Sequence, residues 1–487
     1  MSTFKTLLVL LFVSWKLDSK RSGLFRAPIH EDIRLKFVDS FFGSLSSKAT
    51  AQEQIHLQLS TSDTGASTLP DWIVRHAGPI APFHQIGYYE APSKGCKVVQ
   101  VNHLQRHGSR YPTAKITKKI QSALEKLTEA SHLDESMNFI TNYQYRLSEA
   151  SLLPLGASES FKAGVQFASR YEEIFSQEKL PFVRASLSER VVDSANNFTK
   201  GLASRIDNGI ESIKPIVISE DSQSNNTLDN NSCPNRPSSD EKDQWLNIFG
   251  TPITKRLNSL APNADLDNED TLALMQLCIF ESLADEKLSQ FCDIFDHSDW
   301  PGYGYYYDLD KYYDRGLGNR LGQAEGIGYV AELTTRMTGD RKWIEQDKSK
   351  VNQTLDQSSA TFPLDRGIYI DFSHDNQMVA ILAALGLQPH VDLPATGPPP
   401  SHKIWDVSKW MPFASRLTIE KLSCGHHDTA FVRFVLNDMI LTIPPCKTSD
   451  QNDTFREIPS ICLLSQFIES RRGLLSQSQD LHEQCSA

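Results

Sequence analysis

The same order of patterns, an apolar strand followed by a polar loop and a helix, occurs twice in this chain. The first strand is expected at 97–104 (KVVQVNHL), and a helix with apolar residues at helical spacing follows Thr113, which can cap it. The second strand is expected at 367–373 (GIYIDFS), before a buried helix at 378–385 (MVAILAAL) that ends at Gly386. Two such units predict an α/β fold with a mostly parallel sheet and flanking helices.

Composition along the chain indicates how this fold is organised. The 487 residues are 39% hydrophobic, so the chain can bury a large core. We expect residues 1–73 to be a signal peptide and an N-terminal extension, because 44–70 is a polar stretch rich in Ser and Thr. Residues 74–487 would then form one α/β unit. Helical patterns at about 115–180 and 240–300 predict a smaller α-helical domain, a cap, inserted into this unit.

Charge and the N-terminal sequence limit the partners and the compartment. The net charge of −11 argues against a general nucleic-acid binder or a binder of anionic membranes, but it allows a local basic pocket. The apolar run at 7–13 follows Lys5 and fits the core of a signal peptide, whereas a membrane span needs about 20 such residues. We therefore expect a secreted, extracellular monomer with no nucleic-acid or membrane partner.

Sequons and cysteines are consistent with secretion. Five Asn-x-Ser/Thr sequons predict glycosylation at Asn197, Asn225, Asn230, Asn352 and Asn452. The polar tract 219–243 contains two of them and is expected to be a surface loop. The chain has 8 cysteines and no Cys-x-x-Cys pair, which favours disulfides over a zinc site.

The polar loop after the first strand (106–113, RHGSRYPT) carries the residue types of a phosphate site. Arginine binds phosphate oxygens bidentately, and the N-terminus of the following helix adds amide donors and a favourable dipole. His107, between Arg106 and Arg110, can attack phosphorus as a nucleophile. From composition alone, an exposed basic loop with a solvated histidine is the favoured interpretation, because Arg and His often occur together.

The loop after the second strand (373–376, SHDN) adds a second histidine and a carboxyl group. Ligands of open parallel sheets bind outside the carboxyl ends of the strands, where His107 and His374 are both expected. Asp375 could protonate a leaving alkoxide there, provided that its pKa is high enough to keep the proton. Another His-Asp segment, 425–428 (GHHD), is typical of a surface turn, and no third ligand at metal-site spacing accompanies it.

With these two motifs the chain resembles the histidine acid phosphatases, a branch of the phosphoglycerate-mutase-like superfamily with Arg-His-Gly-x-Arg-x-Pro and His-Asp motifs. The resemblance covers about residue 74 to the C-terminus and implies the phosphoglycerate-mutase-like fold for this catalytic unit. Further segments resemble the secreted fungal phytases of that family, namely 183–201 (VRASLSERVVDSANNFTKG), 291–296 (FCDIFD), 308–333 (DLDKYYDRGLGNRLGQAEGIGYVAEL) and 371–387 (DFSHDNQMVAILAALGL).

The resemblance implies a secreted phosphomonoesterase that hydrolyses phytate, myo-inositol hexakisphosphate, to lower inositol phosphates. It implies His107 as the nucleophile that becomes phosphohistidine and Asp375 as the proton donor to the leaving group, without a metal or a cofactor. Arg184 is expected to form a structural salt bridge. The implied phosphate-binding residues are Arg106, Arg110, Arg190 and His374. The implied disulfides are Cys96–Cys424, Cys233–Cys485, Cys278–Cys292 and Cys446–Cys462.

The lysines bear on the choice of substrate. Lys311 matches a pocket lysine of the phytases that the chain resembles, so it is an implied substrate contact. Lys115 is a further candidate contact, but Ile116 occupies the place of the second family lysine. Lys115, Lys118 and Lys119 share one helix face, which either binds further phosphates or is solvated.

Three alternatives therefore stand beside phytate hydrolysis. A broad-specificity secreted acid phosphatase would act on sugar phosphates or nucleotides through the same residues. A catalytically silent secreted binding protein would have the same fold, but the presence of both His107 and Asp375 argues against it. A phosphomutase is disfavoured by the secretion signals and the phytase-like segments.

Overall fold

A mixed sheet organises the part of the chain that the computed structural model describes, which is residues 68–175, 179–206, 213–221, 224, 226–229, 232–349, 353–425, 428–442 and 461–486. The strand order is β3-β2-β4-β1-β5-β6-β7, and β8 pairs with β6. The strands are β1 (Cys96–Arg106), β2 (Phe182–Ser186), β3 (Ile216–Ile218), β4 (Ile368–Ser373), β5 (Arg416–Cys424), β6 (Thr429–Leu436), β7 (Met439–Leu441) and β8 (Cys462–Leu463).

β1 is the strand at which the two halves of the sheet meet. On one side it pairs parallel with β4, and the parallel pairing continues through β2 and β3. On the other side it pairs antiparallel with β5, which is followed by β6 and β7. The α/β class is confirmed, and the carboxyl ends of the four parallel strands lie along one edge. The antiparallel half was not separately predicted from the sequence.

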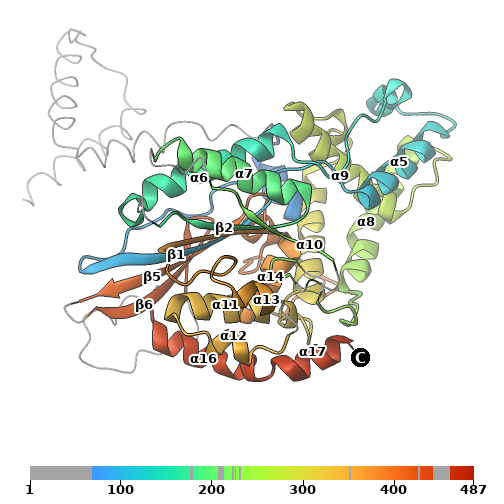
Figure 1. Cartoon of the computed structure of the whole chain (residues 1–487). Coiled ribbons are helices and arrows are strands. Elements are labelled where there is room, and N and C mark those ends of the chain that lie inside the picture. The colour runs from blue at the N-terminus through green and yellow to red at the C-terminus, as the bar shows by residue number, and fades with distance from the viewer. Residues whose placement is uncertain are drawn as a thin grey trace, which may run out of the picture. The chain divides into compact units, whose positions relative to one another are not determined.

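Helices cover both faces of the sheet (Figure 1). The α-helices are α4 (Asp71–Val74), α5 (Ala114–Thr128), α6 (Pro154–Arg170), α7 (Glu189–Ala203), α8 (Glu241–Leu260), α9 (Asn268–Asp285), α10 (Trp300–Asp314), α11 (Ile327–Thr338), α12 (Lys342–Gln346), α13 (Gln353–Gln357), α14 (Asp375–Leu385), α15 (Val407–Trp410), α16 (Leu464–Ser476) and α17 (Ser478–Ser486). The 3₁₀ helices are η1 (Gly78–Ile80), η2 (Glu135–Asn142), η3 (Glu172–Ile174), η5 (Gln290–Cys292), η6 (His297–Asp299) and η7 (Ala324–Gly326).

Alternating side chains explain how the parallel half is covered. Ile370 and Phe372 of β4 pack with Phe198 of α7 in a core that α6 shares. The residue between them, Asp371, points to the other face, where Arg336 of α11 binds it. Strand residues i and i+2 share a face, so this alternation assigns α6 and α7 to one side and α11 to the other, as Figure 1 shows.

A second group of helices packs away from the sheet. α9 packs against both α5 and α8, which lie in the same region of Figure 1, and α9 is buried along most of its length. α6 also lies within the range 115–180, but it packs against α7 beside the sheet. At the start of the described chain, Leu69 and Ile73 are already buried. The division at residue 74 and the limits of the cap stay predictions.

Three disulfides hold the described residues together. They join Cys96 to Cys424, Cys233 to Cys485 and Cys278 to Cys292, which are pairs that the resemblance implies. Cys96 and Cys424 are register partners on β1 and β5, so this bond braces the strand that ends at Arg106. Cys446 lies outside the described residues, and its pairing with Cys462 stays a prediction.

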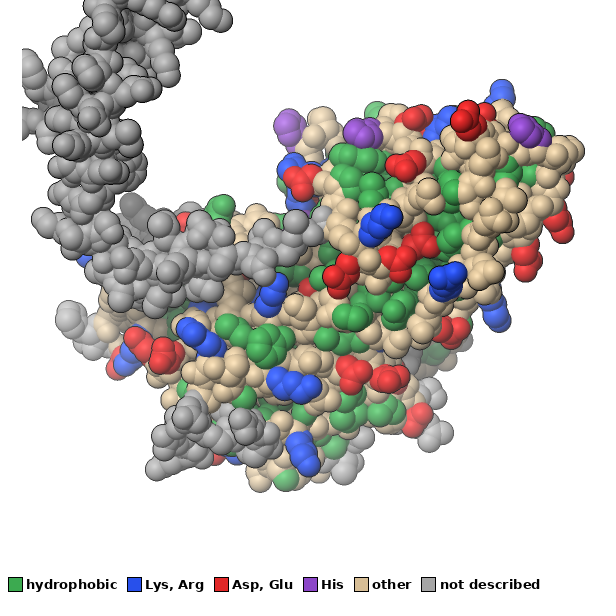
Figure 2. All heavy atoms as spheres, turned by 90° about the horizontal axis from the view of Figure 1, so that it is seen from above, with side chains coloured by type: hydrophobic (Ala, Val, Ile, Leu, Met, Phe, Trp, Pro, Cys, Tyr) green, Lys and Arg blue, Asp and Glu red, His purple; other side chains and the backbone are tan. Residues whose placement is uncertain are grey.

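The surface agrees with the charge balance. On the face shown in Figure 2, acidic and basic side chains are interspersed and do not form one broad basic field. None of the described helices is long and apolar enough to cross a membrane.

Candidate active site

The two sequence motifs meet at the carboxyl edge of the parallel strands. Arg106 and Ser373, the last residues of β1 and β4, are register partners. His107 and His374 follow them, with ring centroids 5.7 Å apart. The backbone N–H of His107 donates to the carbonyl of Ser373 at 3.1 Å, which ties the two loops together. This edge is where α/β sheets bind ligands.

His107 has the protonation pattern of a nucleophile. Its side chain is buried, and Nδ1 lies 2.9 Å from the carbonyl oxygen of Gly108. A carbonyl can only accept, so Nδ1 carries the proton and Nε2 keeps its lone pair. Burial, followed by three nearby guanidinium charges, holds the pKa of His107 well below its ordinary value of 6.5. The imidazole therefore stays neutral and nucleophilic in acidic solution.

Those guanidinium groups belong to Arg106 of β1, Arg110 of the following loop and Arg190 in the first turn of α7. Within the described residues, none accepts a hydrogen bond from the buried Nε of any of the three. Burial, followed by the charges of Arg190 and Arg106, lowers the pKa of Arg110 to about 9. Crowded like charges with unsatisfied donors are unfavourable until an anion neutralises them. The cluster therefore fits a tetrahedral oxyanion such as a phosphoryl group.

Arg106 is the most firmly held of these arginines. It is only 1% exposed, and its Nη1 donates to the carbonyls of Met411, at 2.7 Å, and Pro79. The ring of Phe413 lies 4.7 Å from its guanidinium carbon. These contacts come from segments far apart in the chain, and together they fix the direction of the guanidinium group.

The loop after β1 is anchored to both helices of one face. A Cβ at Gly108 would lie 2.3 Å from the carbonyl oxygen of Gly156 in α6, so only glycine permits this approach. The N–H and hydroxyl of Ser109 donate to the carboxylate of Glu159 at 2.7 and 2.9 Å. The N–H of Gly108 donates to the hydroxyl of Ser194 in α7 at 3.0 Å. The loop is thereby held in one conformation.

Asp375, the first residue of α14, lies between two cations. Its carboxylate is 2.9 Å from Nζ of Lys311 in α10 and 3.7 Å from Arg106. Burial alone would raise the pKa of Asp375, but Arg106 and Lys311 outweigh burial and hold this pKa well below its ordinary range. The condition stated in the sequence analysis, a pKa high enough to keep the proton, is not met by these neighbours alone.

His374 has a carboxylate partner that the sequence analysis missed. Its Nε2 lies 2.9 Å from Oε1 of Glu220, which follows β3, and its Nδ1 lies 3.4 Å from Nη2 of Arg190. The expectation that 219–243 is a surface loop is wrong for the residues 226–229, which are buried. Pairing of β3 with β2 draws this tract to the sheet edge, where its polar groups bond internally. Its polar composition had hidden this.

The remaining candidates take different positions. Lys311 lies beside Asp375, whereas Lys115 is exposed at the start of α5. Lys119, on the same face as Lys115, pairs with Glu269 and so links α5 to α9. Arg184 is buried and binds two carboxylates, as expected of a structural salt bridge.

One of the five predicted sequons lies in a described helix. Asn197 lies in α7, where its Nδ2 donates to the carbonyl of Asp193 at 2.9 Å. Asn225, Asn230, Asn352 and Asn452 lie outside the described residues, as do His426 and His427 of the turn-like segment.

One trio among the described side chains has the spacing of metal ligands. Donor atoms of Glu220, Asp229 and His374 all lie within 4.8 Å of one another. Glu220 already accepts hydrogen bonds from His374, Ser186 and Ser188. We therefore interpret the trio as a hydrogen-bonded group around His374.

Comparisons with known proteins agree with this geometry. The family model of the histidine phosphatase superfamily (branch 2) matches residues 97–437. Phytase A of Aspergillus awamori is 36% identical over 397 residues, which are 76% of this chain and 83% of that protein. Phytase A of Emericella nidulans is 35% identical over 408 residues, 79% of this chain and 87% of that protein.

A solved structure supports the fold. The phytase from D. castellii superposes with a TM-score of 0.66 at 23% identity, covering 88% of this chain and 92% of that one. The matched residues include both strand-end motifs. The chain belongs to branch 2 of the histidine phosphatase superfamily and is a phosphoric monoester hydrolase.

Proposed function

We propose that this enzyme hydrolyses phytate to lower inositol phosphates through a phosphohistidine formed on His107. The observation that carries the proposal is the crowding of three guanidinium groups around a neutral histidine whose Nε2 keeps its lone pair. The proposal is further supported by relatives named Phytase A that match about three quarters of the chain.

In the first step, Nε2 of His107 attacks phosphorus while the phosphorus–oxygen ester bond breaks. The electron pair of that bond leaves on the alkoxide oxygen, which takes a proton from Asp375. Arg106, Arg110 and Arg190 bind the three non-bridging oxygens and balance their charge through the transition state.

In the second step, a water molecule replaces the histidine. Its oxygen attacks phosphorus while Asp375, now a carboxylate, takes one of its protons. The nitrogen–phosphorus bond breaks, its electron pair returns to Nε2 of His107, and inorganic phosphate leaves. The second step thus restores both side chains, and the chemistry assigned to them needs neither a metal nor a cofactor.

Lys311 supports a substrate with several phosphates. Its ammonium group lies beside Asp375, at the side from which a leaving group would receive its proton. A second phosphate on the same inositol ring would then lie close to the ammonium charge of Lys311. Lys115 stays a weaker proposal because it is exposed. Lys119 forms an ion pair with Glu269, so one lysine fewer is available to bind further phosphates of the substrate. This favours the second candidate function, a broad-specificity acid phosphatase.

We place this enzyme outside the cell, as a glycosylated monomer with residues 1–73 as signal peptide and extension. Disulfides persist in oxidising compartments, and the three among the described residues support this location.

The test compares wild type with His107→Ala and His132→Ala on phytate and p-nitrophenyl phosphate at about pH 5. His132 is exposed and serves as the matched control. We expect His107→Ala to lose about a thousandfold or more of kcat/KM on both substrates, as nucleophile variants do, and His132→Ala to match wild type.

Two outcomes of this comparison would count against the proposal. Unchanged phosphate release by His107→Ala would remove the nucleophile assignment. A wild-type kcat/KM that is lower for phytate than for the monophosphate would favour the broad-specificity enzyme.

A further inference from the structure

Glu220 is anchored at the same sheet edge as the proposed catalytic residues. It follows β3, the outermost parallel strand, and it lies two residues beyond Ile218, which pairs with Ser186 of β2. Its Oε1 accepts from the hydroxyl of Ser186 at 2.7 Å and the N–H of Ser188 at 2.9 Å. Its Oε2 accepts from the hydroxyl of Ser188 at 2.6 Å. The carboxylate is therefore fixed before it meets His374.

The contact with His374 determines where the ring holds its proton. Burial alone would raise the pKa of Glu220, but the hydrogen bonds that it accepts outweigh burial and hold this pKa below its ordinary range. An ionised carboxylate can only accept, so Nε2 of His374 is the donor across the 2.9 Å contact. Nδ1 is then the atom turned toward Arg190, 3.4 Å away.

We propose that Glu220 is a positioning residue for phosphoryl transfer, which fixes the ring of His374 so that Nδ1 faces the phosphoryl group bound by Arg190. The inference rests on the proposed function and assigns to it a residue outside the two motifs. Glu220 thereby keeps Nε2 of His374 engaged, so that Nδ1 stays on the side of the ring that faces Arg190. Without Glu220, the ring can turn or exchange tautomers.

The experiment is a double-mutant cycle with p-nitrophenyl phosphate as the substrate. Glu220→Gln keeps the shape of the side chain but removes its charge, and it is made in wild type and in His374→Ala. In wild type we expect kcat/KM to fall about tenfold to a hundredfold. This is the range seen when a residue that orients a metal-bound histidine by a hydrogen bond is replaced. In His374→Ala we expect the same substitution to change kcat/KM by less than about twofold, because its target is gone.

The adjacent residue provides a matched control. Asp221 is exposed and bonds to the hydroxyl of Ser219, so Asp221→Asn removes the same charge one residue away from the contact. We expect Asp221→Asn to match its parent in both backgrounds. An equal loss from Asp221→Asn and Glu220→Gln would show a general charge effect and overturn the proposal.

The cycle also separates positioning from support of the fold. Loss of the same factor in both backgrounds would mean that Glu220 acts through Ser188 and the start of α7, which overturns the role assigned through His374. Thermal unfolding and near-ultraviolet circular dichroism verify that each variant is folded. If Glu220→Gln does not fold, Glu220→Asp replaces it, with a smaller loss expected that still depends on His374.

Failure of this inference differs from failure of the proposed function. If wild type hydrolyses p-nitrophenyl phosphate but not phytate, the proposal of phytate as the substrate is wrong. The mutant cycle still tests Glu220 in that case, because it uses p-nitrophenyl phosphate. If neither ester is hydrolysed, calorimetric binding of inorganic phosphate replaces kcat/KM in the same cycle. The role of Glu220 is supported if Glu220→Gln weakens phosphate binding in wild type but has no effect on it in His374→Ala. Unchanged phosphate binding in wild type overturns this role.

Discussion

The charge of Asp375 depends on what lies beside it. With only Lys311 and Arg106 as partners, the carboxyl group is held ionised, although a proton donor must hold its proton. A bound anion brings negative charge next to the carboxylate and engages the same two cations. Both effects raise the pKa of Asp375. In the proposed mechanism, binding of the substrate would thus create the acid that the first step needs.

Anion binding should therefore be linked to proton uptake. Inorganic sulfate is a suitable probe because it has no proton to exchange at about pH 5. We expect wild type to take up a fraction of a proton per sulfate bound, and Asp375→Asn to take up much less. Titration calorimetry in buffers of different ionisation enthalpy measures this difference. Equal uptake by the two proteins would assign the proton to another group.

At this scale the sequence predicted the candidate catalytic residues but not the residues that support them. His107, His374 and Asp375 stand in motifs that directly follow apolar strands, so their meeting was predictable. Glu220 follows a strand of only three residues in a polar tract, where no periodicity signals a buried strand end. The ionised state of Asp375 could not be predicted from the sequence either, because Lys311, which stabilises it, lies on a helix 64 positions earlier in the chain.

Among the structural elements, the short helix α13 is joined to α11 through two carboxyl groups. Asp356 of α13 is buried near Glu332, which also binds Arg184 of β2. Burial, followed by the charge of Glu332, raises the pKa of Asp356 to about 8. A proton held here keeps two carboxyl groups from repelling each other across the contact between the helices.

This proton makes the stability of the fold depend on pH. The unfolded chain releases it near pH 3.8, whereas the folded protein keeps it until about pH 8. The stabilisation is complete below the first value and is lost as the pH rises through the second. We expect the melting temperature of wild type to fall over this range, and that of Asp356→Asn to fall less, by calorimetry.

The control for this prediction is Asp285→Asn, at an exposed site at the end of α9. It should follow the wild-type slope. A slope for Asp356→Asn that parallels wild type would show that the carboxyl pair does not govern this pH dependence.

Element positions were less predictable than element existence. The apolar spacing of α6 showed that one of its faces is buried, but not which element covers that face. In the structure Phe167 of α6 packs against Phe198 of α7 beside the sheet, whereas α5 packs against α9. A single helical pattern looks the same in both settings, because burial is a property of the partner surface.

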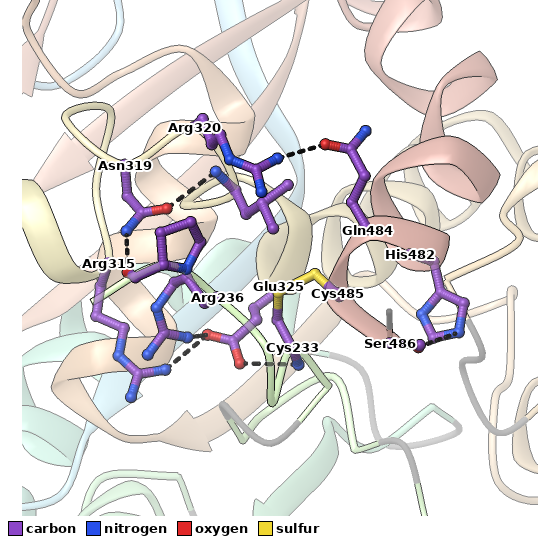
Figure 3. The surroundings of a disulfide bond; sticks show 12 residues. Cys233, Arg236, Arg315, Asn319, Arg320, Glu325, His482, Gln484, Cys485 and Ser486 are labelled. Carbon is purple, nitrogen blue, oxygen red and sulfur yellow. Dashed lines mark hydrogen bonds and ion pairs between the residues drawn. A yellow bond between two sulfur atoms is a disulfide. The ribbon is translucent and has the colours of Figure 1, made fainter. Parts of the chain in front are cut away.

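At the scale of the molecule, the disulfide Cys233–Cys485 ties the tract behind Glu220 to the C-terminal helix α17. Figure 3 shows Glu325 next to this disulfide. Its carboxylate accepts from the N–H of Cys233 at 3.3 Å and from Arg236 at 3.1 Å. Earlier in the same tract, the carbonyl of Leu228 accepts from the hydroxyl of Ser373, beside the candidate active site. The Cys233–Cys485 disulfide therefore restrains the tract that contacts Ser373, although the disulfide itself lies outside the candidate site.

Removal of this disulfide should affect stability and activity together. The double variant Cys233→Ser/Cys485→Ser is expected to lose about 3 kcal/mol of unfolding free energy, the usual order for a native disulfide. We also expect a several-fold lower kcat/KM, because the tract beside His374 loosens. Cys278→Ser/Cys292→Ser is the control, since that bond spans a sequence separation of only 14 at α9. A larger loss of activity in the control than in the first variant would contradict this assignment.

The carbonyl of Pro79, which holds Arg106, lies outside the matched span of the family, residues 97–437. A shortened protein that began at residue 97 would keep every residue of both motifs, yet one donor of its buried arginine would lose its acceptor. For anyone who transplants or fuses this enzyme, the family boundary is therefore the wrong place to cut. The segment from Leu69 onward has to accompany the strand that it precedes.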